Sequence, residues 1–251
     1  MNKKMMLTGI TIASVLFWQI ALASNRIIPF TENDAKFAKS LVDNDVNKLF
    51  AGGKVSGNYG YNYITAIDLY KKYSENEVRA NRELKYKKVI ISGKIKSINN
   101  YPSDGKSFIA LSAGSFLDTV HAALGNNFQD YALELRKGQK VTLACEVVGT
   151  VVGEPVVKDC IPESNAKEQV TQSLVLQINK AINGDRDESN RKGVVIVALT
   201  KLVSLSTNNF SICKKIDISC LQLANNPKWK KFAAENKGQI EQYKKMLDNQ
   251  K

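Results

Sequence analysis

Residues 145–160 read Cys-Glu-Val-Val-Gly-Thr-Val-Val-Gly-Glu-Pro-Val-Val-Lys-Asp-Cys, and this stretch decides the fold. Two valine-rich runs flank a Gly-Glu-Pro segment that is typical of a turn, so the sequence predicts a β-hairpin. The two cysteines stand symmetrically about the turn, and the hairpin is expected to bring them face to face. A disulfide needs Cβ atoms about 4 Å apart, which directly opposed strand residues supply.

The symmetric strand register has a weakness in its charges. It sets Glu146 opposite Asp159, and two carboxylates facing each other across a hairpin are unfavourable. A one-residue bulge near Gly149 or Gly153 would relieve the mismatch, because it shifts one strand relative to the other. We therefore expect the disulfide to form whether or not the symmetric register holds.

Outward from the hairpin, the chain alternates between apolar and polar residues in further short runs. In the first run Val89, Ile91 and Ile95 share one side, and Gly93 is typical of a bulge or sharp bend. A helical segment at 126–135 has a glycine, Gly138, where a helix-ending glycine belongs. Five strands with a helix between the third and fourth are the arrangement of an OB-type β-barrel. The predicted strands span residues 87–98, 107–112, 117–123, 141–148 and 156–161.

Short helices are expected before the barrel. Thr31 is positioned to cap the first, with Asp34 three residues later. A second helix is expected to begin at Ile64, and Ser74 is a candidate cap for a third.

A helical region is expected after the barrel. Its predicted helices cover 169–182 and 194–205, and one last helix begins with Asn226 as cap and Pro227 at its first position. The predicted fold class is therefore α+β. We expect four segments along the chain: a signal peptide at 1–23, an N-terminal helix and linker at 24–60, an OB-fold domain at 61–162 and a helical C-terminal region at 163–251.

The N-terminus has the features of an export signal. Two lysines precede a mostly apolar run from Leu7 to Ala23, which ends in Ala-Leu-Ala. Signal peptidase accepts only small side chains beside the cut, so cleavage is expected after Ala23. The run is short for a membrane helix, which needs roughly 20 residues, although an uncleaved anchor is the alternative. The predicted location is the periplasm or the exterior.

Export makes disulfides the default state of the four cysteines. Local spacing favours the pairs Cys145–Cys160 and Cys213–Cys220 among the three pairings that four cysteines allow. A zinc site is disfavoured because there is no Cys-x-x-Cys and the single histidine, His121, lies elsewhere. We predict no metal and no cofactor.

Several segments together resemble the tRNA_anti-like family of OB-fold proteins, over roughly residues 64–162. The third strand departs from that family's usual pattern, because His121 and Ala122 stand where a cysteine is common. The resemblance implies an OB fold and an exported bacterial protein, and it implies no particular activity. The segments that carry it are Ala66-Ile-Asp-Leu-Tyr, Asn76-Glu, Ala80, Tyr86-Lys-Lys-Val-Ile-Ile-Ser-Gly-Lys-Ile, Leu135-Arg-Lys-Gly-Gln-Lys-Val and Cys160-Ile.

The residues do not point to an enzyme. The chain has one histidine and no Gly-x-Ser-x-Gly, P-loop or His-Glu-x-x-His motif. His121 is expected to be an ordinary strand residue with a satisfied hydrogen bond. We predict a non-catalytic binding or interaction protein whose partner is a protein or a small ligand.

Nucleic acid or another anionic polymer is the alternative partner, since the formal charge is +12. An OB barrel binds through its second and third strands and the neighbouring loops, and aromatic rings among lysines suit a single strand. The opposing interpretation is that the lysines are simply solvated and the aromatic ring packs beneath the N-terminal helices. The candidate ligand-binding residues are Lys94, Lys96, Tyr101, Lys106 and Phe108.

Overall fold

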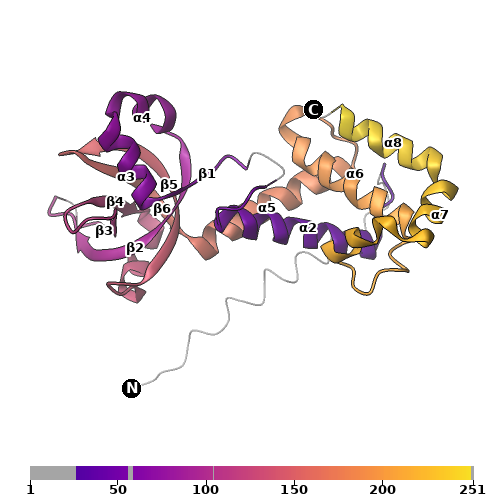
Figure 1. Ribbon diagram of the computed structural model, residues 1–251, viewed down its shortest axis with the longest axis horizontal. Helices are drawn as coiled ribbons and strands as arrows, with labels where there is room; N and C mark the ends of the chain where they lie inside the picture. The colour runs from indigo at the N-terminus through magenta and orange to yellow at the C-terminus, as the bar shows by residue number, and fades with distance from the viewer. Residues whose placement is uncertain (1–26, 56–58, 104, 250–251) are drawn as a thin grey trace, which may run out of the picture. The chain divides into compact units, whose positions relative to one another are not determined.

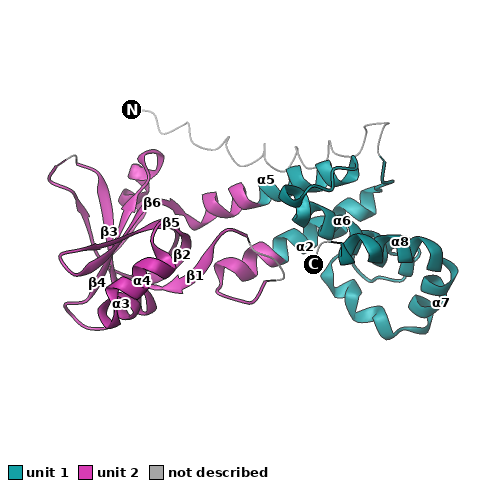
Figure 2. Cartoon of the chain, turned by 90° about the horizontal axis from the view of Figure 1, so that it is seen from above, with its two compact units in different colours: residues 1–44, 171–251 teal, residues 45–170 magenta. Residues whose placement is uncertain are grey.

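A computed structural model describes residues 27–55, 59–103 and 105–249, so the predicted signal peptide lies outside the described residues. The chain forms two compact units, which Figure 2 shows in different colours. One unit comprises residues 45–170, here called the sheet unit. The other comprises residues 1–44 and 171–251, here called the helical unit. Within the described ranges, no helix combines the length and the apolar character that a membrane crossing requires.

The sheet unit is a mixed α+β structure with a six-stranded sheet. The strand order is β1-β2-β3-β4-β6-β5, and an additional pairing of β5 with β2 closes five of the strands into a ring (Figure 1). A 3₁₀ helix, η2, runs from Asn126 to Glu134 between β4 and β5. The strands are β1 (Asn62–Thr65), β2 (Lys88–Asn100), β3 (Ser107–Ser112), β4 (Thr119–Leu124), β5 (Lys140–Val151) and β6 (Glu154–Pro162).

The predicted strand count was one too low, because β1 was expected to be the start of a helix. Asn62–Thr65 instead pairs in parallel with β2, so that Ile64 lies opposite Ile91. The helix begins only at Ala66, where the Thr65 hydroxyl accepts a hydrogen bond from the Asp68 amide at 3.0 Å. The helix was predicted from Ile64 because helical spacing of apolar residues begins there. The strand with which β1 pairs lies more than 20 residues away, so the local sequence does not indicate that residues 62–65 form a strand.

Two short helices, α3 (Ala66–Glu75) and α4 (Glu77–Leu84), lie beside the strands (Figure 1). The prediction that Ser74 caps α4 is wrong, because Ser74 is still inside α3 and donates to the Lys71 carbonyl. The cap is Asn76, whose side-chain oxygen accepts from the Arg79 amide at 2.9 Å. Asn is as good a cap as Ser, and it stands two residues closer to the second helix.

The β5–β6 hairpin forms, but it turns one position earlier than Gly-Glu-Pro. Val152 and Gly153 occupy the turn, both with positive φ (52° and 82°), and Glu154 already belongs to β6. Two residues with positive φ are characteristic of the tight turn that matches the twist of a hairpin. Val152 is a poor residue for this conformation, because a β-branched side chain is strained at positive φ.

The observed register removes the charge mismatch of the symmetric one. Glu146 lies opposite Lys158, and their charged atoms are 3.4 Å apart. Register shifts occur between Val147 and Gly149 and again beside Cys145. A bulge near Gly149 was one of the two predicted solutions, and it is confirmed.

The predicted disulfide between the two hairpin strands is present. The Cα atoms of Cys145 and Cys160 are 4.2 Å apart, and both side chains are buried in the core of the ring. Asp159 has a positive φ of 50° opposite this point, which accommodates the second register shift. Closing a loop of this length contributes about 3 kcal/mol in the chain-entropy model.

The interior of the ring is a single apolar cluster. Val89, Ile91 and Ile95 of β2 lie in it, as their alternation predicted. Gly93 belongs to the same side of β2 and was expected at a bulge or a sharp bend. There is no bulge at this position in the pairing with β5, because Gly93 lies in regular register opposite Val141. A Cβ on Gly93 would lie 3.0 Å from the Ala66 Cβ, so the glycine allows α3 to approach closely.

The helical unit is built from portions of two long helices and several shorter ones. The predicted single last helix is two helices, because Asn236 ends α7 and begins α8. Asn226 caps α7 and Pro227 occupies its first turn, as predicted. The helices are α2 (Glu32–Phe50), α5 (Glu163–Ile182), η3 (Glu188–Asn190), α6 (Arg191–Ser206), η4 (Ile218–Asn225), α7 (Pro227–Glu235) and α8 (Lys237–Asp248).

A buried ion pair joins α2 to α6 within this unit. Lys201 Nζ lies 3.0 Å from Asp34 Oδ2, and the exposed fractions of the side chains are 10% and 0%. The same carboxylate accepts from the Thr31 amide at 2.7 Å, and the Thr31 hydroxyl accepts from the Asp34 amide. The predicted capping arrangement is thus confirmed, and its carboxylate has a second partner in a distant helix.

The second predicted disulfide, Cys213–Cys220, is also present. The residues between the two cysteines form a loop that leads into η4 at Ile218, as the seven-residue spacing required. Two disulfides in one chain indicate a protein of an oxidising, extracytoplasmic compartment.

Candidate functional site

An aromatic ladder crosses the outer face of two neighbouring strands, β3 and β4, and reaches the loop between β2 and β3. We use this name for Tyr101, Phe108 and His121. The ring centroids of Tyr101 and Phe108 are 4.5 Å apart and their planes differ by 28°. Those of Phe108 and His121 are 5.1 Å apart and differ by 19°. The three rings are therefore stacked in one row.

The position of the ladder follows from strand alternation and register. Ile109 and Leu111 of β3 lie in the core, so the residue between Ser107 and Ile109, Phe108, faces outward. Val120 and Ala122 of β4 likewise lie in the core, so His121 faces outward beside it. Phe108 pairs with Ala123, and His121 is its diagonal neighbour, within reach of an aromatic ring.

Tyr101 completes the row from the loop between β2 and β3. Its amide donates to the Lys106 carbonyl at 2.9 Å, and the Gly105 amide donates back to the Tyr101 carbonyl at 2.9 Å. These two hydrogen bonds tie the ends of the loop together. Because β3 lies between β2 and β4, Tyr101 and His121 cover Phe108 from opposite sides.

A carboxylate ends the ladder on the β6 side. His121 Nε2 donates to Glu154 Oε2 at 2.6 Å, and the two side chains are 28% and 34% exposed. Glu154 is the first residue after the Val152–Gly153 turn. The ladder therefore runs from the β2–β3 loop to the β5–β6 hairpin.

Gln129 of η2 braces the base of the ladder. Its side-chain oxygen accepts from the Ser107 amide at 2.6 Å, and its side-chain nitrogen donates to the Leu124 carbonyl at 2.8 Å. These bonds join the start of β3 to the end of β4. The residue that follows Ser107 is Phe108, so the brace fixes the strand that carries the central ring.

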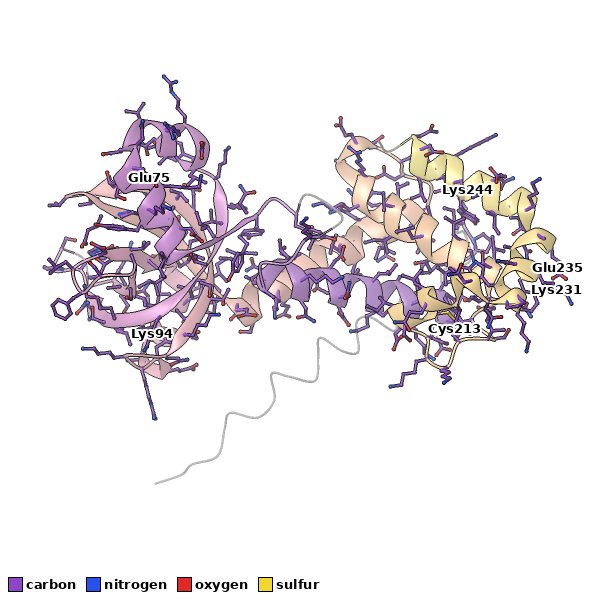
Figure 3. The ribbon with its side chains drawn as sticks, in the orientation of Figure 1. Glu75, Lys94, Cys213, Lys231, Glu235 and Lys244 are labelled. Atoms are coloured by element: carbon purple, nitrogen blue, oxygen red, sulfur yellow. A yellow bond between two sulfur atoms is a disulfide. The ribbon has the colours of Figure 1, made fainter. Side chains whose placement is uncertain are left out.

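The two predicted lysines of β2 do not lie beside Phe108. Lys94 is paired with Lys140 of β5, at the point where β2 leaves β5 for β3 (Figure 3). It stands seven residues before Tyr101, which is about 23 Å along an extended strand. The structure therefore brings together Tyr101 and Phe108, with Lys106 in the adjoining loop, and separates Lys94 from them.

Lys96 belongs to a different feature, the loop between β3 and β4. Its Nζ lies 5.5 Å from the centroid of the Phe116 ring and donates to the Leu117 carbonyl at 3.4 Å. Phe116 and Leu117 are 87% and 77% exposed. Hydrogen bonds from Ser115, and then from Tyr70, lower the pKa of Asp118 at the end of this loop.

His121 and Glu154 were not among the predicted ligand-binding residues. His121 was expected to be an ordinary strand residue with a satisfied hydrogen bond, and only the β3–β4 register places it against Phe108. In the described part of the chain, no three His, Cys, Asp or Glu side chains converge as they would around a metal ion.

The chain belongs to the tRNA_anti-like family, whose model matches residues 1–161, more than half of the sequence. A search of curated proteins finds no significant match. Among solved structures the chain is similar to a "putative nucleic acid-binding lipoprotein" of Klebsiella pneumoniae subsp. pneumoniae. The identity is 14% and the TM-score 0.34, over 40% of this chain and 91% of the other.

Proposed function

We propose that the protein is an exported, non-catalytic OB-fold binding protein of the bacterial periplasm, and that the aromatic ladder is its binding surface. The ring of β2-β3-β4-β6-β5, with η2 between its third and fourth strands, has the connectivity of an OB barrel. In this proposal β1 is an addition to the edge of the barrel. The two disulfides support the exported location.

The main support for the proposal is the position of the ladder on the strands and loops through which OB folds bind. OB barrels bind through their second and third strands and through the loops that join strands one to two and four to five. These elements are β3, β4, the 101–106 loop and the Val152–Gly153 turn. Phe108 and His121 lie on the two strands, Tyr101 begins the first loop, and Glu154 follows the turn. The ladder and Glu154 thus have one residue on or beside each element through which an OB fold binds.

The chemistry of the ladder favours a protein or small ligand. Both faces of the Phe108 ring are covered by its neighbours, so that ring offers an edge and not a stacking platform. The Glu154 carboxylate at one end repels polyanions. A partner with apolar groups and hydrogen-bond donors fits this surface, because the donors meet Glu154 and the apolar groups meet the ring edges.

Single-stranded nucleic acid or another anionic polymer is the second candidate. The formal charge of +12 favours it, as does Lys106 in the loop that begins with Tyr101. It predicts binding of a fluorescent oligonucleotide that weakens steeply with salt and is lost on Tyr101→Ala. Weak binding that Tyr101→Ala leaves unchanged would exclude the ladder as a nucleic-acid site.

The principal candidate is tested by photo-cross-linking in the periplasm of living cells. A benzophenone amino acid is placed at position 106, beside the ladder, and as a control at position 137, an exposed lysine beyond η2. We expect a discrete adduct at position 106 and none at position 137, and loss of the adduct when Tyr101 and Phe108 are both changed to Ala. Equal adducts at the two positions would contradict the proposal.

A further inference from the structure

A basic surface lies on the helical unit, around the second disulfide. Cys220, Phe37, Val203 and Phe210 form a buried apolar cluster, and Trp229 of α7 packs against it. Cys213 and Ile216, from the loop that the disulfide closes, pack against the same cluster. The disulfide loop and the start of α7 are therefore neighbours on one small core.

Exposed lysines adjoin three of these residues in the sequence, namely Cys213, Ile216 and Trp229. Two lie between Cys213 and Ile216, and three surround Trp229 in the first turns of α7. All five side chains are exposed. We call this set the lysine patch: Lys214, Lys215, Lys228, Lys230 and Lys231.

The positive charge of the lysine patch is largely uncompensated. Of its members, only Lys231 has a carboxylate within 4 Å in the part of the chain that the structure describes, namely Glu235 at 3.9 Å (Figure 3). The single acidic residue between positions 207 and 234 is Asp217. Its carboxylate accepts from the Ser219 amide and hydroxyl, and these bonds, with a smaller contribution from the charge of Lys215, lower its pKa. Asp217 therefore compensates part of the charge of one patch lysine.

The start of α7 adds to this charge. The first turn of a helix has unpaired amides and a partial positive charge, so acidic residues are favoured there and lysines are not. The first turn of α7 contains no acidic residue, whereas Lys228 and Lys230 lie in it. This arrangement costs helix stability in the free protein, and an anionic partner would relieve the repulsion.

We propose that the lysine patch docks on a bilayer rich in anionic phospholipid. Lipid is favoured over nucleic acid because apolar side chains accompany the lysines: Leu221, next to Cys220, is 44% exposed, and Trp229 is only half-buried. Trp and Leu among lysines are typical of surfaces that lie in the headgroup region. An extracytoplasmic protein also meets membrane phospholipid routinely.

The test uses the protein purified from the periplasm of the expression host, so that both disulfides form. Binding is measured by co-sedimentation with vesicles of phosphatidylethanolamine containing 30% phosphatidylglycerol, and with vesicles of phosphatidylcholine alone. Each lysine near an anionic surface contributes a factor of about five in the partition coefficient. We therefore expect the patch variant, with all five lysines changed to Gln, to lose at least about 25-fold if two of them contact lipid.

A matched variant removes the same charge elsewhere. It changes five exposed lysines of the sheet unit to Gln, namely Lys54, Lys85, Lys87, Lys137 and Lys140. We expect its binding to fall by less than about threefold, which long-range electrostatics accounts for at physiological salt. Circular dichroism checks that both variants keep the native helix content.

Three results would overturn the proposal. The first is equal binding to anionic and neutral vesicles. The second is an equal loss in the patch variant and the matched variant, which would indicate net charge and not a surface. The third is a single-stranded oligonucleotide that binds more tightly than the vesicles and depends on the same five lysines, because the patch would then be a nucleic-acid site.

Discussion

The ion pair between Asp34 and Lys201 allows a sharp prediction about the helical unit. Lys201→Met keeps the length and most of the apolar contacts of the side chain but removes its charge. Asp34 would then be a fully buried carboxylate whose remaining partners are the amide and hydroxyl of Thr31. Its other oxygen, Oδ1, has no hydrogen-bond partner among the described residues even in the native protein.

The expected loss of stability is large for a single substitution. Removing one member of a buried ion pair costs about 3–5 kcal/mol, because the remaining charge stays desolvated. Both side chains are almost completely buried, so solvent screening reduces this figure little. With a urea m-value of about 2 kcal/mol/M, a loss of about 3 kcal/mol lowers the unfolding midpoint by about 1.5 M.

Tryptophan fluorescence reports this transition directly. Trp229 packs against the apolar cluster of the helical unit, and the only other tryptophan, Trp18, lies in the predicted signal peptide. Lys36→Met is the matched control, since Lys36 pairs with Glu32 on the exposed side of α2. An exposed pair contributes at most about 1 kcal/mol, so the control midpoint is expected to move by less than about 0.5 M.

The double variant Asp34→Asn with Lys201→Met separates the charge from the packing. It removes the uncompensated carboxylate, so we expect it to recover more than half of the stability lost in Lys201→Met. A midpoint for Lys201→Met within about 0.3 M of the native value would refute the reasoning, because it would mean that water reaches the pair.

Three further predictions concern single positions. Gly193→Ala should lower the melting temperature of the helical unit by several degrees, because the new Cβ would lie 2.1 Å from the Gln177 carbonyl oxygen and force α5 and α6 apart; an unchanged melt would contradict this close approach. Val152→Asn should stabilise the sheet unit by about 1 kcal/mol in urea unfolding, since Asn tolerates positive φ, and a destabilised variant would show that the turn has another form. Burial and a hydrogen bond to Asp45 raise the pKa of Tyr59, so its contribution to stability should be complete below about pH 10 and decline above it, as the unfolded chain ionises; Tyr59→Phe should remove this part of the alkaline loss, and an identical pH profile would count against it.

Much of the sheet unit is predictable from local pattern. The strand at 107–112 and the core-facing residues of β2 follow from alternation, because one face of each strand is buried. Both disulfides follow from spacing and export. The bulge near Gly149 follows from the charge mismatch that any symmetric register would create.

The features of the fold that were not predicted depend mostly on contacts between residues that are distant in the sequence. β1 forms because β2 offers a free edge, and this information is absent from residues 62–65 themselves. The turn lies at Val152–Gly153 although valine is unfavourable there, because the register of the whole hairpin outweighs a local preference. The last predicted helix divides at Asn236, which closes α7 by donating from its amide and its side chain to the Phe232 carbonyl. In this case a local interaction interrupts a continuous apolar pattern.

The candidate site was predicted in part for the same reason. Tyr101 and Phe108 were predicted because an OB barrel binds through its second and third strands and the neighbouring loops, and the structure stacks their rings. His121 joins them through the register of β4 against β3, and Glu154 joins through the pairing of β4 with β6, a strand that is distant in the sequence. Lys94 was also predicted to belong to the site, but it pairs with Lys140 of β5, away from the aromatic rings.

The most direct test of the binding surface is the yield of the cross-linked adduct at position 106 in ladder variants. Tyr101→Ala and His121→Ala each remove one end of the ladder. Tyr86→Ala removes an aromatic ring that is 69% exposed in the turn before β2, where the Tyr86 amide donates to the Val147 carbonyl of β5. We predict that each ladder variant reduces the yield at least about tenfold, equivalent to the loss of roughly 1.4 kcal/mol of binding, while Tyr86→Ala leaves it unchanged. An adduct that forms equally in all three variants would contradict the assignment of the ladder as the binding surface.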